Sequence, residues 1–326
     1  MLTKVFAIFG LIVTIGAVGE QEIWTTFKTV HQKTYNPKIE QVRYSIFLDN
    51  LKKVEAHNKK FDQGLVSYKM RLNKFADLTA EEFASLLGFG KNQNNNTEST
   101  TFSAPSNVNL PESVNWIDAG AVTGVKDQGS CGSCWSFSAT GAIEGQYFLK
   151  TNKLVSFSEQ NLVDCSGAYG DYGCSGGIMD YAFQYVIDNG IMSESDYPYE
   201  GYDNTCRFDE SKMVTKVASF VDITPGSEDD LQAAVATVGP ISVAVDASYF
   251  QLYDSGVFDS QACGNSRGYL NHGILAVGYG TTEDGVEYWL VKNSWGQDWG
   301  ENGYIRMSRN KDNQCGIATY SSYPVL

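Results

Sequence analysis

The residues of this chain best suited to chemistry are one thiol, one imidazole and two amides. Cys134 lies in the run CGSCW at positions 131–135, and Gln128 lies shortly before it. His272 and Asn293 follow far downstream, in the runs NHG and NSWG. A nucleophile, a base, a group that orients the base and a donor for an oxyanion are the parts of an acyl-transfer site. The sequence therefore predicts hydrolysis of an acyl bond, with Cys134 as the nucleophile.

The thiol must ionise to act. An ordinary cysteine has a pKa of about 8.5 and is mostly neutral at pH 7. A predicted helix over residues 134–150 places Cys134 at a helix N-terminus, where unpaired amides stabilise an anion. A neighbouring imidazolium would bring the pKa of the thiol into the range of about 3.5–7.5. Both effects predict a thiolate–imidazolium pair.

His272 is the candidate base, because the other two histidines lie far upstream. A single histidine among apolar residues such as Leu270 is more often part of the core, but the cysteine and NSWG runs favour catalysis. We expect Asn293 to accept a hydrogen bond from the imidazole and Trp295 to shield that bond. Taken alone, these two would be a strand end and a core residue.

The tetrahedral intermediate needs donors where negative charge develops. The Gln128 side chain and the backbone N–H of Cys134 can supply two. The alternative for Gln128 is an ordinary turn with Gly129 and Ser130, so its role depends on the other residues of the site.

Composition limits the class of protein. The chain has 326 residues and a formal net charge of −14, concentrated beyond residue 110. This charge excludes a typical nucleic-acid binder, which needs a basic face. No cofactor is predicted.

The first residues are typical of a secretory signal. Lys4 precedes an apolar stretch over 5–15, and small residues over 17–19 suit cleavage. A membrane anchor is the alternative, but it needs about 20 apolar residues. A secreted chain favours disulfides, and its seven cysteines leave at least one thiol unpaired within the chain. An unpaired thiol suits a nucleophile.

Hydrophobic spacing predicts a helical region over 20–88. It includes one long helix from Arg43 to Asn58, a strand over 70–78, and a helix capped by Thr79 with Glu82 at its third position. Residues 89–109 are polar and predict a flexible linker, with a glycosylation sequon at Asn95.

From Leu110 the sequence predicts helices first and strands later. The expected helices cover 134–150, 176–189 and 227–237, and the expected strands cover 241–246, 273–280, 286–293 and 304–308. This order indicates an α+β fold of two lobes.

Together these runs are highly specific, and the chain resembles the papain family of cysteine proteases, with the cathepsin L group most similar. The motifs that carry the resemblance are DQGSCGSCWSFS, GCSGGIMDYAF, NHGILAVGYG and YWLVKNSWG. It implies catalytic roles for Cys134, His272 and Asn293, with Gln128 in the oxyanion hole. It also implies a papain-like fold with a helical left lobe and a β-barrel-like right lobe.

The resemblance covers nearly the whole chain and implies its organisation. Residues 1–19 would be the signal peptide, 20–109 an inhibitory propeptide (inhibitor part 24–83) with its linker, and 110–326 the mature peptidase. The implied disulfides are Cys131–Cys174, Cys165–Cys206 and Cys263–Cys315; from the sequence alone the pairing stays open.

In the family the propeptide crosses the cleft in reverse orientation and is removed at acid pH. Arg43, Phe47 and Asn50 match its helical motif, whereas Ile39 stands where a glutamate is usual and Arg71 where a glycine is usual. The basic first region and the acidic second region agree with release by acid, because protonated carboxylates attract basic residues less.

The resemblance also implies the substrate-binding residues, which are Gly176, Gly177, Ile178, Met179, Leu270, Asn271, Gly273, Trp295 and Tyr320. The pocket for the second residue before the cut carries no charge, so we expect an apolar side chain there. Tyr320 is larger than the usual residue at the pocket floor and predicts a preference for Leu or Val over Phe.

Two other functions remain open from the sequence. A catalytically dead relative would act as a binding protein, but such relatives usually lose the cysteine or histidine. A metal or redox module could use Cys131 and Cys134, although no further ligands or thioredoxin-like context stand out. The expected partners are protein and peptide substrates, the chain's own propeptide and cystatin-type inhibitors, with no nucleic acid and no membrane span. We expect a monomer in the secretory pathway, lysosomal or extracellular, including a digestive lumen.

Overall fold

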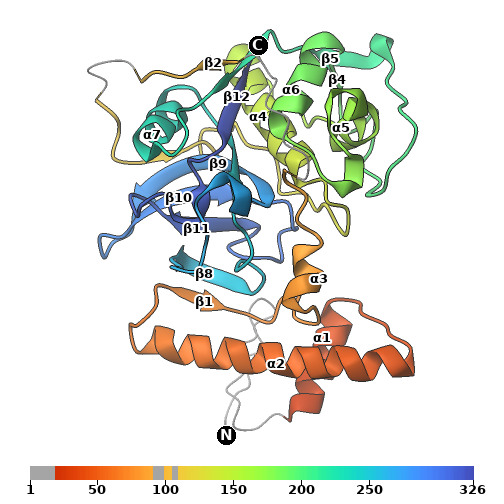
Figure 1. The fold of residues 1–326 in the computed structure, drawn as a ribbon, viewed down its shortest axis with the longest axis vertical. Coiled ribbons are helices and arrows are strands. Elements are labelled where there is room, and N and C mark those ends of the chain that lie inside the picture. Colours follow the sequence, from red (N-terminus) through yellow and green to blue (C-terminus); the bar gives the residue numbers. More distant parts are fainter. Residues whose placement is uncertain (1–18, 91–98, 105–108) are drawn as a thin grey trace, which may run out of the picture.

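Three apolar clusters organise this protein, one in the N-terminal helices and one in each of two lobes. The computed structural model describes residues 19–90, 99–104 and 109–326. Figure 1 shows the N-terminal helices at one end and the chain rising from them between the two lobes. The predicted α+β fold with a helical N-terminal region is confirmed.

The N-terminal unit is built on α1 (Glu20–Val30) and the long α2 (Pro37–Asp62). Asn36 caps α2 by accepting a hydrogen bond from the Ile39 N–H at 3.0 Å. Trp24 of α1 packs against Phe47 of α2, with ring centroids 5.1 Å apart. The strand β1 (Tyr68–Met70) then pairs antiparallel with β8 (Tyr253–Phe258), so this unit is docked on the edge of the large sheet.

The predicted strand over 70–78 is wrong beyond Met70, because the segment forms turns. Asn73 accepts a hydrogen bond from the Phe75 N–H at 3.0 Å and donates one to the Gln251 carbonyl at 2.8 Å. These bonds replace a strand ladder. The helix α3 (Ala80–Ala84) follows, and its predicted capping box between Thr79 and Glu82 is present.

The helical lobe surrounds α4 (Cys134–Thr151), as predicted, and α4 is buried from Cys134 to Gly145. Helix α6 begins three residues after its predicted start, because Gly176 is held with φ at +119°. The other elements of this lobe are α5 (Glu159–Cys165), η1 (Ser166–Tyr169), η2 (Gly173–Ser175), α6 (Met179–Asp188), β4 (Ile191–Met192), η3 (Glu210–Lys212) and β5 (Met213–Thr215).

The second lobe is a sheet in the order β1-β8-β11-β10-β9-β7-β12-β6-β2, with β3 beside β9. Its further elements are β2 (Thr100–Thr101), β3 (Val114–Asn115), β6 (Ser219–Asp222), α7 (Glu228–Thr237), β7 (Ile241–Val245), η4 (Arg267–Tyr269), β9 (His272–Thr281), β10 (Glu287–Lys292), β11 (Tyr304–Ser308), η5 (Gln314–Gly316) and β12 (Ser321–Val325). In the described residues the sheet is open, with β1 and β2 at its ends, so the predicted barrel-like form is corrected. The strands predicted near residues 241, 273, 286 and 304 are all present.

Three disulfides join Cys131–Cys174, Cys165–Cys206 and Cys263–Cys315, the same pairs that the resemblance implies. Among the described residues, Cys134 is the one free thiol. No helix in these parts of the chain has the length and apolar character to cross a bilayer. The expected signal over 1–19 lies outside the described residues except for Gly19. Asn95 and residues 107–108 of the predicted cut region at 107–110 also lie outside them.

Candidate active site

Cys134 lies where the two lobes meet. It is the first residue of α4 and is fully buried. Its Sγ accepts a hydrogen bond from the backbone N–H of Gly273 at 3.4 Å, and Gly273 is the second residue of β9. The packing of α4 on β9 therefore places His272, the first residue of that strand, beside the thiol.

The His272 ring is fixed on its far side. Its Nε2 lies 2.8 Å from Asn293 Oδ1, and an amide oxygen can only accept, so the ring carries its proton on Nε2. Among the described residues, the buried Nδ1 has no hydrogen-bond partner. Trp295 stacks on the imidazole, with ring centroids 4.6 Å apart, and is almost fully buried. Nδ1 is thus the nitrogen left to exchange a proton with the thiol.

Gln128 is fully buried beside the thiol. Its Oε1 accepts a hydrogen bond from Ser294 Oγ at 2.7 Å, which leaves the amide nitrogen as donor toward the cleft. Nε2 donates to the Leu86 carbonyl at 3.2 Å and to the Cys131 carbonyl at 2.9 Å. Leu86 belongs to the N-terminal segment, so a backbone carbonyl of this segment is bound to the donor expected for the oxyanion.

Tyr199, which carried no sequence signal as a site residue, supports this loop. Its hydroxyl donates to the Gln128 carbonyl at 2.9 Å and lies 2.7 Å from Ser133 Oγ. It ties the backbone of Gln128 to the residue before Cys134. Ser294 is a second site residue without a predicted role, although it lies within the quoted NSWG run.

The N-terminal segment runs through the cleft. Gly177 donates its N–H to the Gly88 carbonyl at 2.8 Å, and its carbonyl accepts from the Gly90 N–H at 3.2 Å. The Phe89 N–H donates to the Asn271 carbonyl at 3.0 Å. Phe89 and Gly177 form a parallel bridge. The ordered segment therefore extends to Gly90, beyond residue 89 where the sequence predicted a flexible linker to begin.

Gly88 makes the closest approach to the helical lobe. A Cβ at this position would lie 1.8 Å from the Gly132 carbonyl oxygen. Only glycine lets the segment pass this close to the residues before Cys134. The signal in the sequence was the run GFG at 88–90, which overlaps the predicted linker at 89–109.

Phe89 occupies an apolar pocket. Its ring is buried with Met179, Ile178 and Leu270, and it packs edge-on against Tyr320 with centroids 5.2 Å apart. The Tyr320 hydroxyl donates to Asp180 Oδ2 at 2.6 Å, which fixes the ring at the pocket wall. Most of the residues that the resemblance assigned to substrate binding thus lie around the segment at 88–90, whereas Trp295 packs on His272, Phe75 and Phe83.

Burial changes the ionisation of the pair. It raises the pKa of the Cys134 thiol, although backbone N–H groups of Gly273 and Gly88 oppose this. Burial lowers the pKa of His272 to about 4, although the hydrogen bond to Asn293 acts to raise it. Burial therefore favours the neutral thiol and the neutral imidazole while the segment covers them, because charges cost more away from water. The thiolate–imidazolium pair stays a prediction for the uncovered site.

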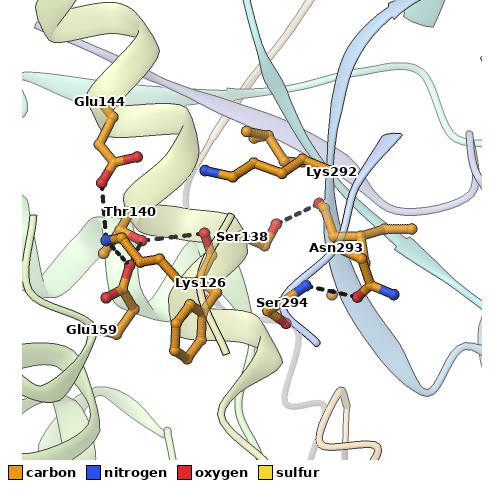
Figure 2. A pocket seen from close by; sticks show the side chains of 12 residues that line it. Lys126, Ser138, Thr140, Glu144, Glu159, Lys292, Asn293 and Ser294 are labelled. Atoms are coloured by element: carbon orange, nitrogen blue, oxygen red, sulfur yellow. Dashed lines mark hydrogen bonds and ion pairs between the residues drawn. The ribbon is translucent and has the colours of Figure 1, made fainter. Parts of the chain in front are cut away.

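Behind Asn293 the lobes share a small polar cavity of about 20 Å³, room for about one water molecule. Figure 2 shows Lys126 between Glu144 and Glu159, with Lys292 reaching in beside Asn293. Lys126 Nζ lies 2.6 Å from Glu159 and 3.1 Å from Glu144. Burial raises the pKa of Glu159 to about 7 against the attraction of Lys126. Lys292, from β10 of the sheet lobe, donates to Thr123 Oγ1 at 2.9 Å beside this buried ion-pair cluster.

Comparison with known proteins identifies the family. The pattern of papain family cysteine proteases matches residues 110–325, and that of the cathepsin propeptide inhibitor domain matches 24–83. The chain belongs to the papain family. It is similar to a cathepsin L-like peptidase of Aedes aegypti, with 52% identity over 94% of this chain and 93% of that one, and to cathepsin L of Sarcophaga peregrina, with 49% identity over the full length of both.

The solved structures agree. Digestive procathepsin L 3 of the Tenebrio molitor larval midgut has a TM-score of 0.88 and 48% identity, over 94% of this chain and 99% of that one. The recombinant stem bromelain precursor has a TM-score of 0.85 and 36% identity, over 94% of this chain and 99% of that one. The chain is a cathepsin L-like cysteine endopeptidase carrying a propeptide inhibitor domain.

Substituting Gly88 with valine tests the close approach. The added side chain meets the Gly132 carbonyl, and such overpacking costs about 1–3 kcal/mol, which weakens inhibition about fivefold to 150-fold. The measurement is the rate at which the precursor acquires peptidase activity near neutral pH. Gly64→Asn is the control, because its Cβ meets open space and asparagine tolerates its positive φ. Equal rates for Gly88→Val and the unsubstituted precursor would contradict the account.

Proposed function

We propose that residues 110–326 hydrolyse peptide bonds with Cys134 as nucleophile and His272 as base, and that residues 20–109 hold this peptidase inactive. The observation that carries the proposal is the 2.8 Å contact between His272 Nε2 and Asn293 Oδ1. It fixes the ring so that Nδ1 is left for the thiol at the start of α4. A histidine that served only as a core residue would have no reason to leave a buried nitrogen unsatisfied.

The reaction follows from these positions. His272 takes the thiol proton, and Cys134 Sγ attacks the carbonyl carbon of the substrate. The oxyanion accepts hydrogen bonds from Gln128 Nε2 and the Cys134 N–H. The imidazolium then protonates the leaving amine, and a thioester forms. Water, deprotonated by His272, attacks the thioester and releases the acid and the thiol.

Activation requires that the segment covering Cys134 and His272 leaves the cleft. Removing the segment at 86–90 admits water to the thiol and imidazole, and the burial that favours their neutral forms is relieved. Arg71 pairs with Asp254 at 2.7 Å and Lys74 with Asp127 at 2.5 Å. Both ion pairs link the propeptide to the peptidase. We place the signal at 1–19 and the activation cut near 107–110.

The pocket that holds Phe89 is proposed to bind the second residue before the cut, with an apolar preference. A phenyl ring fits there beside Tyr320, so this arrangement weighs against the predicted preference for Leu or Val over Phe. The edge-on contact adds about 0.5–1.5 kcal/mol for an aromatic side chain.

Location and partners are further parts of the proposal. A relative from a larval midgut is described as digestive, which supports a gut lumen as one site of action beside the lysosome and the extracellular space. Protein and peptide substrates, cystatin-type inhibitors and a monomeric state stay predictions. The redox or metal role of Cys131 with Cys134 is not favoured, because Cys131 is bonded to Cys174.

The direct test of the proposal is Cys134→Ala. We expect the variant precursor to fold, to stay uncut after acidification and to cleave no peptide. Gln128→Ala is expected to lower kcat by about 10²–10³ with little change in KM, because its donor acts on the charge of the transition state. Peptide hydrolysis and gel analysis of processing measure both. Peptide cleavage by Cys134→Ala at the native rate would refute the proposal.

Substrate preference is tested with matched peptides that carry Phe, Leu or Val as the second residue before the cleaved bond. We expect kcat/KM for the Phe peptide to equal or exceed that for Leu. Tyr320→Ala should lower kcat/KM for the Phe peptide by about twofold to tenfold, as the lost ring contact implies, with a smaller change for Val. A clear Leu or Val preference in the unsubstituted enzyme would instead restore the expectation drawn from the size of Tyr320.

A further inference from the structure

A buried carboxyl group lies behind the backbone that holds the segment in the cleft. Asp171 lies between η1 and η2, and its side chain is 2% exposed. Its Oδ1 accepts a hydrogen bond from the Ile178 N–H at 2.9 Å. Ile178 directly follows Gly177, whose N–H and carbonyl bind Gly88 and Gly90. Asp171 therefore anchors the residue next to the proposed substrate-binding backbone.

The other oxygen of this carboxyl group reveals where a proton lies. Ser166 Oγ is 2.7 Å from Asp171 Oδ2 and 2.8 Å from the Leu162 carbonyl oxygen. Both distances are those of ordinary O–H···O hydrogen bonds. A carbonyl can only accept, and a serine hydroxyl has a single proton. If Ser166 donates to Leu162, the proton in the other contact belongs to Asp171.

We propose that Asp171 is a positioning residue that works as a neutral carboxylic acid, donating to Ser166 and accepting from Ile178, and that its ionisation loosens the backbone at Gly176–Gly177 and weakens substrate binding. This inference rests on the proposed substrate-binding role of that backbone. Ionised Asp171 can only accept, so Ser166 must turn away from Leu162 to satisfy it. The anchor of Ile178 then shifts with the carboxylate.

The surroundings favour the neutral form. Burial raises the pKa of Asp171 to about 8, the charge of Asp180 on α6 raises it further, and the hydrogen bond from the Ile178 N–H lowers it. A Ser166 hydroxyl that donated to the carboxylate would lower the pKa as well, whereas one that accepts the proton of the neutral acid does not. Asp203 lies on the other side of the disulfide-bonded loop, where it accepts from the Cys174 N–H at 2.7 Å. From α4 the neighbour is the uncharged Trp135, whose ring lies against Gly177. No cation is among the groups that act on Asp171 in the described residues.

The raised pKa has a consequence for stability. An unfolded Asp ionises near pH 4, whereas the folded group stays neutral until about pH 8. Its contribution to stability is therefore complete below about pH 4 and is lost progressively as the pH rises to about 8. A neutral isostere at this position removes that loss. Asp171→Asn keeps an acceptor for Ile178 and a donor for Ser166 at every pH.

Kinetics of the acid-activated enzyme test the binding role. Between about pH 6 and 9 we expect KM of the unsubstituted enzyme to rise about fivefold, which is the change expected from weakening one hydrogen bond. This rise should be larger than any change in kcat over the same pH range. Asp171→Asn should keep KM flat. Ser166→Ala removes the acceptor of the Asp171 proton and should move the rise to lower pH. The same KM rise in Asp171→Asn as in the unsubstituted enzyme would overturn the inference.

Thermal unfolding tests the protonation without any activity. The full precursor carrying Cys134→Ala is compared with and without Asp171→Asn, and Asp196→Asn at an exposed position is the control. The Tm advantage of Asp171→Asn should be small near pH 4 and grow toward pH 8. An advantage that does not change with pH would show an ionised Asp171 and overturn the inference. Because this readout needs no catalysis, it stands even if Cys134 proved not to be the nucleophile.

Discussion

The start of α4 meets the start of β9 at the boundary between the lobes, and the site depends on this meeting. The Gly273 N–H reaches Cys134 Sγ, and His272 precedes Gly273 on the strand. Neither lobe alone holds both groups. Any change in how the lobes pack would separate the thiol from the imidazole. Asn293, which holds the imidazole, lines a small cavity together with the buried Lys126, Glu144 and Glu159.

The propeptide occupies the cleft and leaves Cys134 and His272 fully buried. Its backbone binds to Gly177 and Asn271, and Phe89 fills the apolar pocket. Phe75 and Phe83 pack on Trp295, which itself covers the imidazole. The same dry environment that blocks substrates thus favours the neutral thiol and neutral imidazole. Burial of the site by the propeptide thus both blocks substrates and favours the neutral forms of Cys134 and His272.

The sequence predicted the chemical groups better than their supports. Cys134, His272, Asn293 and Gln128 were singled out because their types and neighbours match one kind of chemistry, and the structure brings them together. Helix α4 was predicted from apolar residues at helical spacing, although the structure buries it on all faces from Cys134 to Gly145. The segment 70–78 was misassigned because its alternating pattern is local, whereas its turns are held by Asn73 through a bond to Gln251, far away in the sequence.

Asp171 and Tyr199 were missed because nothing in a sequence shows that a side chain points at a distant backbone. Gly88 was missed for a similar reason, since its importance lies in a contact with Gly132 that only the fold creates.

The central claim is that the covered pair is neutral and the uncovered pair is ionised. The measurement is the rate of alkylation of Cys134 by iodoacetamide as a function of pH, in the precursor and in the activated enzyme. The account predicts that the activated enzyme reacts well into acid, whereas the precursor reacts slowly and only at alkaline pH. An activated enzyme that reacts like free cysteine, with a midpoint near about pH 8.5, or a precursor that reacts as fast as the activated enzyme, would contradict it.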